Sequence, residues 1–131
     1  MQTMPENEPK KSYLWGGRVA SALPVLALLA SSAMKLSHNP KMVPQFVDKF
    51  GYPESLLSTI GVVELLCALL YAIPQTSVLG AILLTGYLGG AVATHVRVGD
   101  MFGPPLLLGI LVWVGLFLRD ARLRALLPLR K

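Results

Sequence analysis

Four long apolar segments constrain this chain more than any other feature of its sequence. They cover approximately residues 19–34, 56–73, 77–96 and 104–118. Each is near the roughly 20 residues that a helix rising about 1.5 Å per residue needs to cross a hydrocarbon core about 30 Å thick. Continuous apolar runs lack the alternation of membrane β-barrel strands, and an open sheet would leave backbone groups unpaired in lipid. The sequence therefore predicts an all-α integral membrane protein with four transmembrane helices.

Composition supports a lipid environment and excludes several other classes. Only 15% of the 131 residues are charged, whereas a soluble domain has about a quarter. Cys67 is the only cysteine, which excludes an intrachain disulfide and a site made of cysteines alone. The net charge of +5 comes from basic residues at the ends of the apolar runs, so it indicates topology and not nucleic-acid binding.

The turn between the second and third segments predicts an antiparallel bundle. Only Pro74, Gln75 and the residue before Ser77 separate these segments, which leaves room for a tight helical hairpin. With four spans, both termini and this turn share one side. That side carries Lys10, Lys11, Arg18, Arg119, Arg122, Arg124, Arg130 and Lys131, against Lys35, Lys41, Lys49 and Arg97 on the other. The positive-inside rule predicts a multi-pass cell-membrane protein with both termini in the cytoplasm.

The predicted organisation is a single domain with two short tails. Residues 1–12 are expected to be a disordered cytoplasmic tail, residues 13–124 the four-helix transmembrane domain, and residues 125–131 a basic cytoplasmic tail. A second interpretation treats the first segment as a secretory signal, with basic Lys10 and Lys11 before it and small residues 31–33 at its end. The membrane-span interpretation is favoured.

The connection between the first two spans predicts a short amphipathic helix on the outer side. Its apolar residues recur three or four apart and end before a Gly-Tyr-Pro sequence; they are Met42, Val43, Phe46, Val47 and Phe50. Such a helix either anchors in the membrane interface or covers a cavity between the spans. Interfacial anchoring is the favoured prediction, because apolar faces at membrane surfaces usually partition there.

Ionisable residues within the apolar segments indicate a polar pocket in the outer half. Glu64 lies about 12 Å below the outer surface, and an isolated charge there costs at least about 2.5 kcal/mol unless it is paired. Lys35 and His95 come from other spans at a similar predicted height, so a Lys35–Glu64 pair with His95 nearby is expected. Arg97 and Tyr87 complete the predicted pocket. A purely structural pair remains the alternative.

Small residues predict close helix packing. Gly61, Gly86, Gly90 and Thr94 are expected at helix contacts, and the third-span glycines could also form an oligomer seam.

Two histidines, His38 and His95, suggest haem or metal ligation, but His38 falls in a loop. No metal site is therefore predicted.

Four segments of the chain resemble the DoxX-like family of small membrane proteins. These are SSAMKL (31–36), GVVELLCALL (61–70), LTGYLGGAVATHVRVGD (84–100) and LVWVGLFLRDARLRALLPLR (111–130). The resemblance covers nearly everything after Trp15. It implies a four-helix membrane bundle and places Lys35, Glu64, His95 and Arg97 in the family's polar signature. It also implies a link to quinone-coupled thiosulfate oxidation or oxidative-stress complexes, while distant relatives resemble cargo receptors or assembly chaperones.

Three functional hypotheses follow. The leading one is an accessory subunit of a quinone-linked oxidoreductase, with a membrane or soluble enzyme as partner and a quinone or lipid in the pocket. The second is a proton-coupled carrier of small solutes that uses Glu64. The third is a scaffold that recruits proteins through its basic tail. Whether the chain is itself catalytic stays open at this stage, and homo-oligomers are compatible with each hypothesis.

Overall fold

The computed structural model describes residues 11–130, and within that range every regular element is a helix. The elements in order are α1 (Lys11–Leu36), α2 (Met42–Pro44), η2 (Gln45–Lys49), α3 (Leu56–Ala72), η3 (Pro74–Thr76), α4 (Ser77–Arg97), α5 (Gly103–Arg119) and α6 (Ala121–Arg124). The all-α prediction is thus confirmed for the described residues. Most of the expected N-terminal tail, residues 1–10, and Lys131 lie outside them, and α1 already begins at Lys11.

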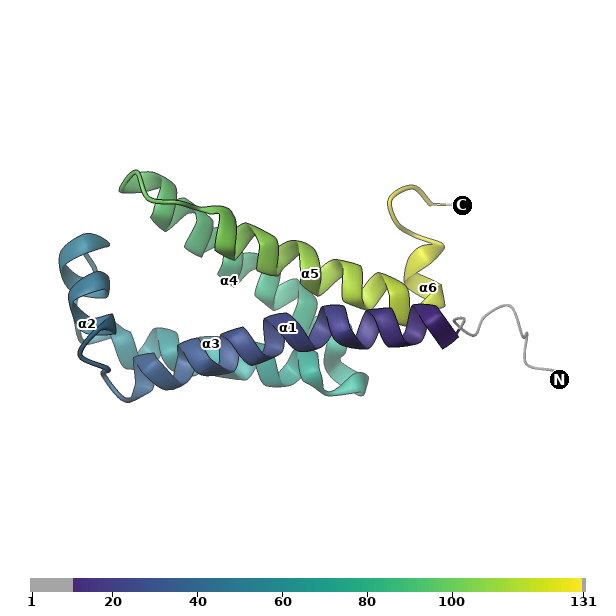
Figure 1. The fold of residues 1–131 in the computed structure, drawn as a ribbon, viewed down its shortest axis with the longest axis horizontal. Coiled ribbons are helices and arrows are strands. Elements are labelled where there is room, and N and C mark those ends of the chain that lie inside the picture. The colour runs from purple at the N-terminus through teal and green to yellow at the C-terminus, as the bar shows by residue number, and fades with distance from the viewer. Residues whose placement is uncertain (1–10, 131) are drawn as a thin grey trace, which may run out of the picture.

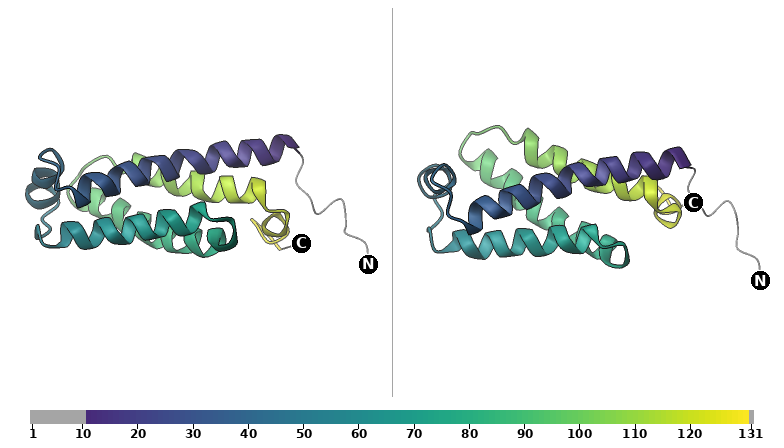
Figure 2. Two further views of the ribbon diagram at one scale, coloured as in Figure 1. Left: turned by 90° about the horizontal axis from the view of Figure 1, so that it is seen from below. Right: turned by 60° about the horizontal axis from the view of Figure 1, so that its bottom comes forward.

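The four long helices lie side by side, with α1 and α4 each packed against both α3 and α5 (Figure 1). At one end lie the start of α1, the η3 turn and α6, and we call this the terminal end. At the other lie α2, η2 and the loop between α4 and α5, which we call the α2 end. Toward the α2 end, α4 and α5 diverge from α1 and α3 (Figures 1 and 2).

Local sequence explains where the helices begin and end. Pro104 and Pro105 occupy the first turn of α5, where a missing N–H leaves no bond unmade. Ile73 is extended, as the residue before a proline prefers, and it separates α3 from η3. Gly51 after η2 and Gly99 after α4 have φ angles of +78° and +71°, a region that side-chain-bearing residues avoid.

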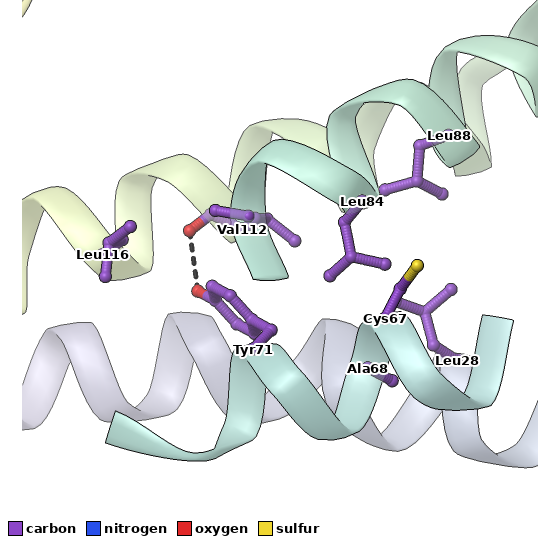
Figure 3. Packing of buried hydrophobic residues seen from close by; sticks show 9 residues of the cluster. Leu28, Cys67, Ala68, Tyr71, Leu84, Leu88, Val112 and Leu116 are labelled. Carbon is purple, nitrogen blue, oxygen red and sulfur yellow. Dashed lines mark hydrogen bonds between the residues drawn. The ribbon is translucent and has the colours of Figure 1, made fainter. Parts of the chain in front are cut away.

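The buried hydrophobic core takes side chains from all four long helices (Figure 3). Its fully buried members include Leu28 on α1, Leu84 on α4 and Val112 on α5. Tyr71 of α3 is also buried; its hydroxyl donates to the carbonyl oxygen of Val112 at 2.6 Å and lies 2.9 Å from the Ser21 hydroxyl. This tyrosine therefore joins three helices through one polar atom.

Glycines bring the helices into backbone contact at the terminal end. A Cβ placed on Gly80 would lie 2.5 Å from the Tyr71 Cα, so no larger residue fits between α4 and α3. A Cβ on Gly115 would lie 2.9 Å from the Ser21 nitrogen and 3.1 Å from the Gly17 oxygen, which closes α1 on α5. The bundle is therefore tightly closed at this end.

The prediction that Gly86 and Gly90 pack against a neighbouring helix is wrong for the described residues. A Cβ on either would meet no atom within 4 Å outside its own helix backbone. Both glycines line a cavity instead. Gly61 does pack closely, since its Cβ would lie 3.1 Å from atoms of Lys35 and Leu36. The glycines of the third span thus make room for a cavity.

The described helices have apolar outer surfaces. Two segments are long and apolar enough to cross a membrane, namely Lys11–Leu36 and Pro74–Arg97, while Leu56–Ala72 and Gly103–Arg119 are shorter apolar helices. Each long helix exposes large apolar side chains, for example Leu26, Leu66, Ile82 and Leu107, all more than half exposed. Patches of this kind are typical of a surface that does not face water.

Candidate functional site

A cavity of about 500 Å³ lies at the α2 end, between the diverging helices and beneath η2. Its wall is mostly apolar and comes from α1, α2, η2, α3 and α4. The lining residues are Ser31, Lys35, Met42, Gln45, Phe46, Phe50, Tyr52, Ile60, Val63, Gly86, Tyr87, Gly90, Ala91, Thr94 and His95. A mainly apolar site with a few polar groups suits a small, largely apolar ligand.

The ion pair expected between Lys35 and Glu64 is present beside this cavity. Lys35 Nζ lies 3.1 Å from Glu64 Oε1, and the two side chains are only 12% and 3% exposed. The same ammonium donates to the Ser31 hydroxyl at 2.7 Å. Because an ammonium has three N–H donors, one donor of Lys35 has no protein acceptor among these contacts. Lys35 lines the cavity, whereas Glu64 lies behind it and not on the cavity wall.

Tyr87 is the α4 residue that reaches Glu64. Its hydroxyl interacts with the Glu64 carboxylate, so α4 contributes to the charge cluster together with α1 and α3. Tyr87 also lines the cavity. The carboxylate, only 2% exposed, is therefore paired with the Lys35 ammonium, and the Tyr87 hydroxyl lies near it.

His95 lines the cavity but does not join Glu64, contrary to expectation. Its Nδ1 lies 2.7 Å from the Ala91 carbonyl oxygen, so Nδ1 carries a proton. Its ring packs on Phe50 with centroids 4.9 Å apart, and Nε2 faces Asp100 Oδ2 at 3.9 Å. The polar residues therefore form two groups instead of one.

The separation of the two groups follows from helix geometry. Tyr87 and His95 are eight residues apart on α4, which corresponds to about 12 Å along the helix. Glu64 lies at the level of Tyr87, so it is too far along the bundle for His95. The expectation of a shared height was wrong, since His95 lies one residue from the end of its apolar segment and Glu64 eight residues into its own.

Tyr52 and Thr94 form a second polar contact on the cavity wall. Its hydroxyl lies 2.6 Å from Thr94 Oγ1, which itself lies 2.9 Å from the Gly90 carbonyl oxygen. Because the threonine has a single hydroxyl proton, which it donates to Gly90, Tyr52 is the donor to Thr94. Thr94 was expected as a helix-packing residue; it is buried, and its hydroxyl holds the loop that carries Tyr52.

Arg97 was predicted to line the pocket, and the structure places it elsewhere. It is not on the cavity wall; its Nη2 donates to the Phe50 carbonyl oxygen, and its guanidinium lies 5.8 Å from the Tyr52 ring centroid. Its three methylene groups let the guanidinium reach past the end of α4 to the neighbouring loop. Arg97 therefore fastens the segment that covers the cavity.

The segment 42–52, which we call the cover, turns its apolar face inward. Phe46 and Phe50 are 4% and 9% exposed and lie on the cavity wall. Phe46 also stacks on Tyr52 with centroids 5.0 Å apart. These two rings therefore face the cavity and not the outer surface, so the structure shows the covering arrangement and not the interfacial anchor that the sequence favoured.

A solvent-facing ion pair also fastens the cover. Lys49 Nζ lies 3.0 Å from Asp100 Oδ2 in the loop after α4. The hydrogen bond from Lys49, followed by one from the Met101 backbone, holds the pKa of Asp100 below its ordinary value. The cover is thus attached to α4 and its following loop through Tyr52, Arg97 and Lys49.

Other candidate residues lie away from the cavity. His38 bonds the Ser58 hydroxyl at 3.0 Å, and Cys67 is buried in the core. In residues 11–130, no three His, Cys, Asp or Glu side chains gather as a metal site would require. Sequence reasoning missed Ser31 and Tyr52 as site residues, although an aromatic residue beside Gly51 was a usable signal.

Comparison with known proteins gives one match. The model of a family described as the DoxX-like family matches residues 19–116. No curated protein and no solved structure matches the chain. The matched range includes α3, α4, the cover and all the residues that line the cavity.

Proposed function

The chain belongs to the DoxX-like family, and from this premise we propose that it is an accessory membrane subunit of a quinone-linked oxidoreductase. In this proposal the four long helices are antiparallel transmembrane spans. Both termini lie in the cytoplasm, and the α2 end faces the opposite side. The cavity at the α2 end receives the head group of a quinone.

Surface chemistry supports four spans, although α3 and α5 are short. Each has 17 residues, about 26 Å of helix, which is at the lower limit for a span. Both expose large apolar side chains, such as Leu66 and Leu107. The terminal end carries the excess of positive charge that marks cytoplasmic loops.

One observation carries the ligand proposal: Lys35 presents an unused N–H donor on the wall of a mainly apolar cavity of about 500 Å³. A quinone head is a flat apolar ring with carbonyl acceptors, so it needs an apolar slot and a donor. Glu64 holds the ammonium in position from behind. The rings of Phe46 and Phe50 would then cover the bound ring.

The test is equilibrium binding of a short-chain ubiquinone to the purified full chain in detergent. We expect Lys35→Met combined with Glu64→Gln, which leaves no buried unpaired charge, to weaken binding about 10-fold or more, since hydrogen bonds to charged groups contribute about 1.5–3 kcal/mol. Glu54→Gln is the matched control, because Glu54 is exposed and faces His38. Wild-type binding by the double variant, or no binding by the wild type, would overturn the proposal.

A proton-coupled carrier is the second candidate, and the burial of Glu64 favours it. An intramembrane carboxylate paired with a lysine beside a cavity is an arrangement that can exchange a proton for a cation. Flux of a small cation into vesicles under a pH gradient should then disappear with Glu64→Gln and persist with Glu54→Gln. Absence of flux in the wild type would exclude this function without affecting quinone binding.

A further inference from the structure

A second cavity, of about 800 Å³, lies at the terminal end, on the opposite side of the core from the first. One wall comes from the η3 turn and the start of α4, with Gln75 and Ser77. The other comes from the end of α5 and from α6, with Leu116, Arg119 and Arg122. Unlike the first cavity, it is lined by arginine side chains.

Arg119 is held in position by its aliphatic stem and by an aromatic ring. Its Cγ lies 2.5 Å from where a Cβ on Gly17 would be, so the bare backbone of α1 accommodates the stem. Its guanidinium carbon lies 5.5 Å from the ring centroid of Tyr71, a cation–π distance. The guanidinium therefore lies beside the cavity in contacts that use none of its N–H donors.

The Nε–Nη2 edge of Arg119 has no hydrogen-bond partner. Both nitrogens are buried and unbonded within the described structure. Leaving buried donors of a charged group unsatisfied is costly, and folded proteins generally satisfy them. This edge presents two parallel N–H groups, the geometry that arginine uses to bind two oxygens of a phosphate or a carboxylate.

The neighbouring charged residues already have partners. Arg122 bonds both oxygens of Asp120, at 3.1 and 3.0 Å, and this contact is the main reason why the pKa of Asp120 lies below its ordinary value. Arg124 donates to the carbonyl oxygens of Phe117 and Leu118. Asp120 is the only carboxylate that the structure describes on the wall of this cavity. Within residues 11–130, no carboxylate on this wall is therefore left to pair with Arg119.

We propose that this cavity binds a phosphate group through the Nε–Nη2 edge of Arg119, and that the phosphate is the headgroup of an anionic membrane lipid. Because both nitrogens of this edge are buried in the structure, binding requires the guanidinium to turn toward the cavity, and no hydrogen bond opposes that rotation. In the proposed topology the cavity lies at the cytoplasmic surface, where anionic lipids concentrate and basic pockets between spans bind their headgroups. The choice of a lipid rests on that topology, but not on the quinone-binding cavity.

The test is native mass spectrometry of the full chain in detergent, titrated with phosphatidylglycerol, with phosphatidylcholine, or with inorganic phosphate. We expect phosphatidylglycerol to bind, and Arg119→Gln to weaken that binding about 10-fold or more. Arg119→Lys keeps the charge but loses the paired donors, so it should also bind more weakly. The matched control is Arg130→Gln, which removes one charge at the same end but outside the cavity.

Each outcome decides the proposal. Phosphatidylglycerol binding that needs Arg119 and resists competition by inorganic phosphate supports the lipid source. Arg119-dependent binding of inorganic phosphate would keep the phosphate site but overturn the lipid. Equal losses in Arg119→Gln and Arg130→Gln, or no loss in either, would overturn the site itself. If Arg119→Gln does not fold, Arg119→Lys compared with Arg130→Gln gives the same decision. Ubiquinone binding by the same protein tests the cavity at the α2 end separately, so a failure of the lipid proposal can be distinguished from a failure of the quinone proposal.

Discussion

The two ends of this helical bundle are built differently from the same kinds of residue. At the terminal end, Gly80 and Gly115 let helix backbones touch. At the α2 end, Gly86 and Gly90 of the same helix, α4, touch nothing within 4 Å and line a cavity. A glycine therefore closes a helix pair or enlarges a pocket according to whether the helices have already diverged at its height.

The largest expected effect concerns the ion pair that holds the open half together. Lys35→Met leaves the Glu64 carboxylate buried without its cation, which should lower the free energy of unfolding by about 3–5 kcal/mol. Adding Glu64→Leu removes the unpaired charge and should recover most of this loss. Unfolding in mixed micelles, followed by circular dichroism, measures both. Equal losses in the single and double variants would show that the pair is not the source of stability.

The next effect compares two glycines of α4 directly. Gly80→Ala places a methyl group against the α3 backbone and should cost about 1–3 kcal/mol through overpacking. Gly90→Ala meets open space and should be neutral or stabilising by up to about 1 kcal/mol, because alanine favours helix. The same unfolding assay gives both values. Similar costs at the two positions would remove the distinction between the two ends.

A smaller effect is expected where the cover meets α4. Tyr52→Phe removes the hydrogen bond to Thr94 and should lower the free energy of local opening of the cover by about 1 kcal/mol. Amide hydrogen exchange in residues 45–52 should then accelerate about 5-fold, while exchange around Tyr71 stays unchanged. Ser37→Ala, which removes an exposed hydroxyl bond elsewhere, is the control. Uniform acceleration along the chain would mean that the cover is not an independent unit.

The smallest effect is a pH dependence at the rim of the cavity. Because the folded pKa of Asp100 lies below its ordinary value of 3.8, the Lys49–Asp100 contact stabilises the cover above that value and loses this contribution as the pH falls through the lowered pKa. Carboxyl NMR of Asp100 should show its pKa rising toward 3.8 in Lys49→Met. No change would mean that the contact does not form in solution.

Much of the fold could be predicted because its signals are local. Continuous apolar runs indicated the four long helices, and the paired prolines at 104 and 105 marked the start of α5. The turn at Pro74 followed from the exclusion of a helix through that residue. The pairing of Lys35 with Glu64 was also predictable, because a buried carboxylate needs a cation within reach.

The rest depends on tertiary geometry that no local pattern encodes. Where α4 leaves its neighbours results from the packing of all four helices, so the roles of Gly80 and Gly90 could not be told apart from spacing. The apolar periodicity around Phe46 fits an anchor and a cover equally well, because both need one apolar face.

Cys67 gives this bundle a natural reporter. It is the chain's only cysteine and is buried in the core between the two cavities. A thiol shielded in this way reacts with a maleimide only when the surrounding helices separate transiently. Its alkylation rate therefore reports the local opening of the protein without any engineered label. Ligands that clamp either end should slow that reaction, and the slowing would rank them by how firmly they tie the helices together.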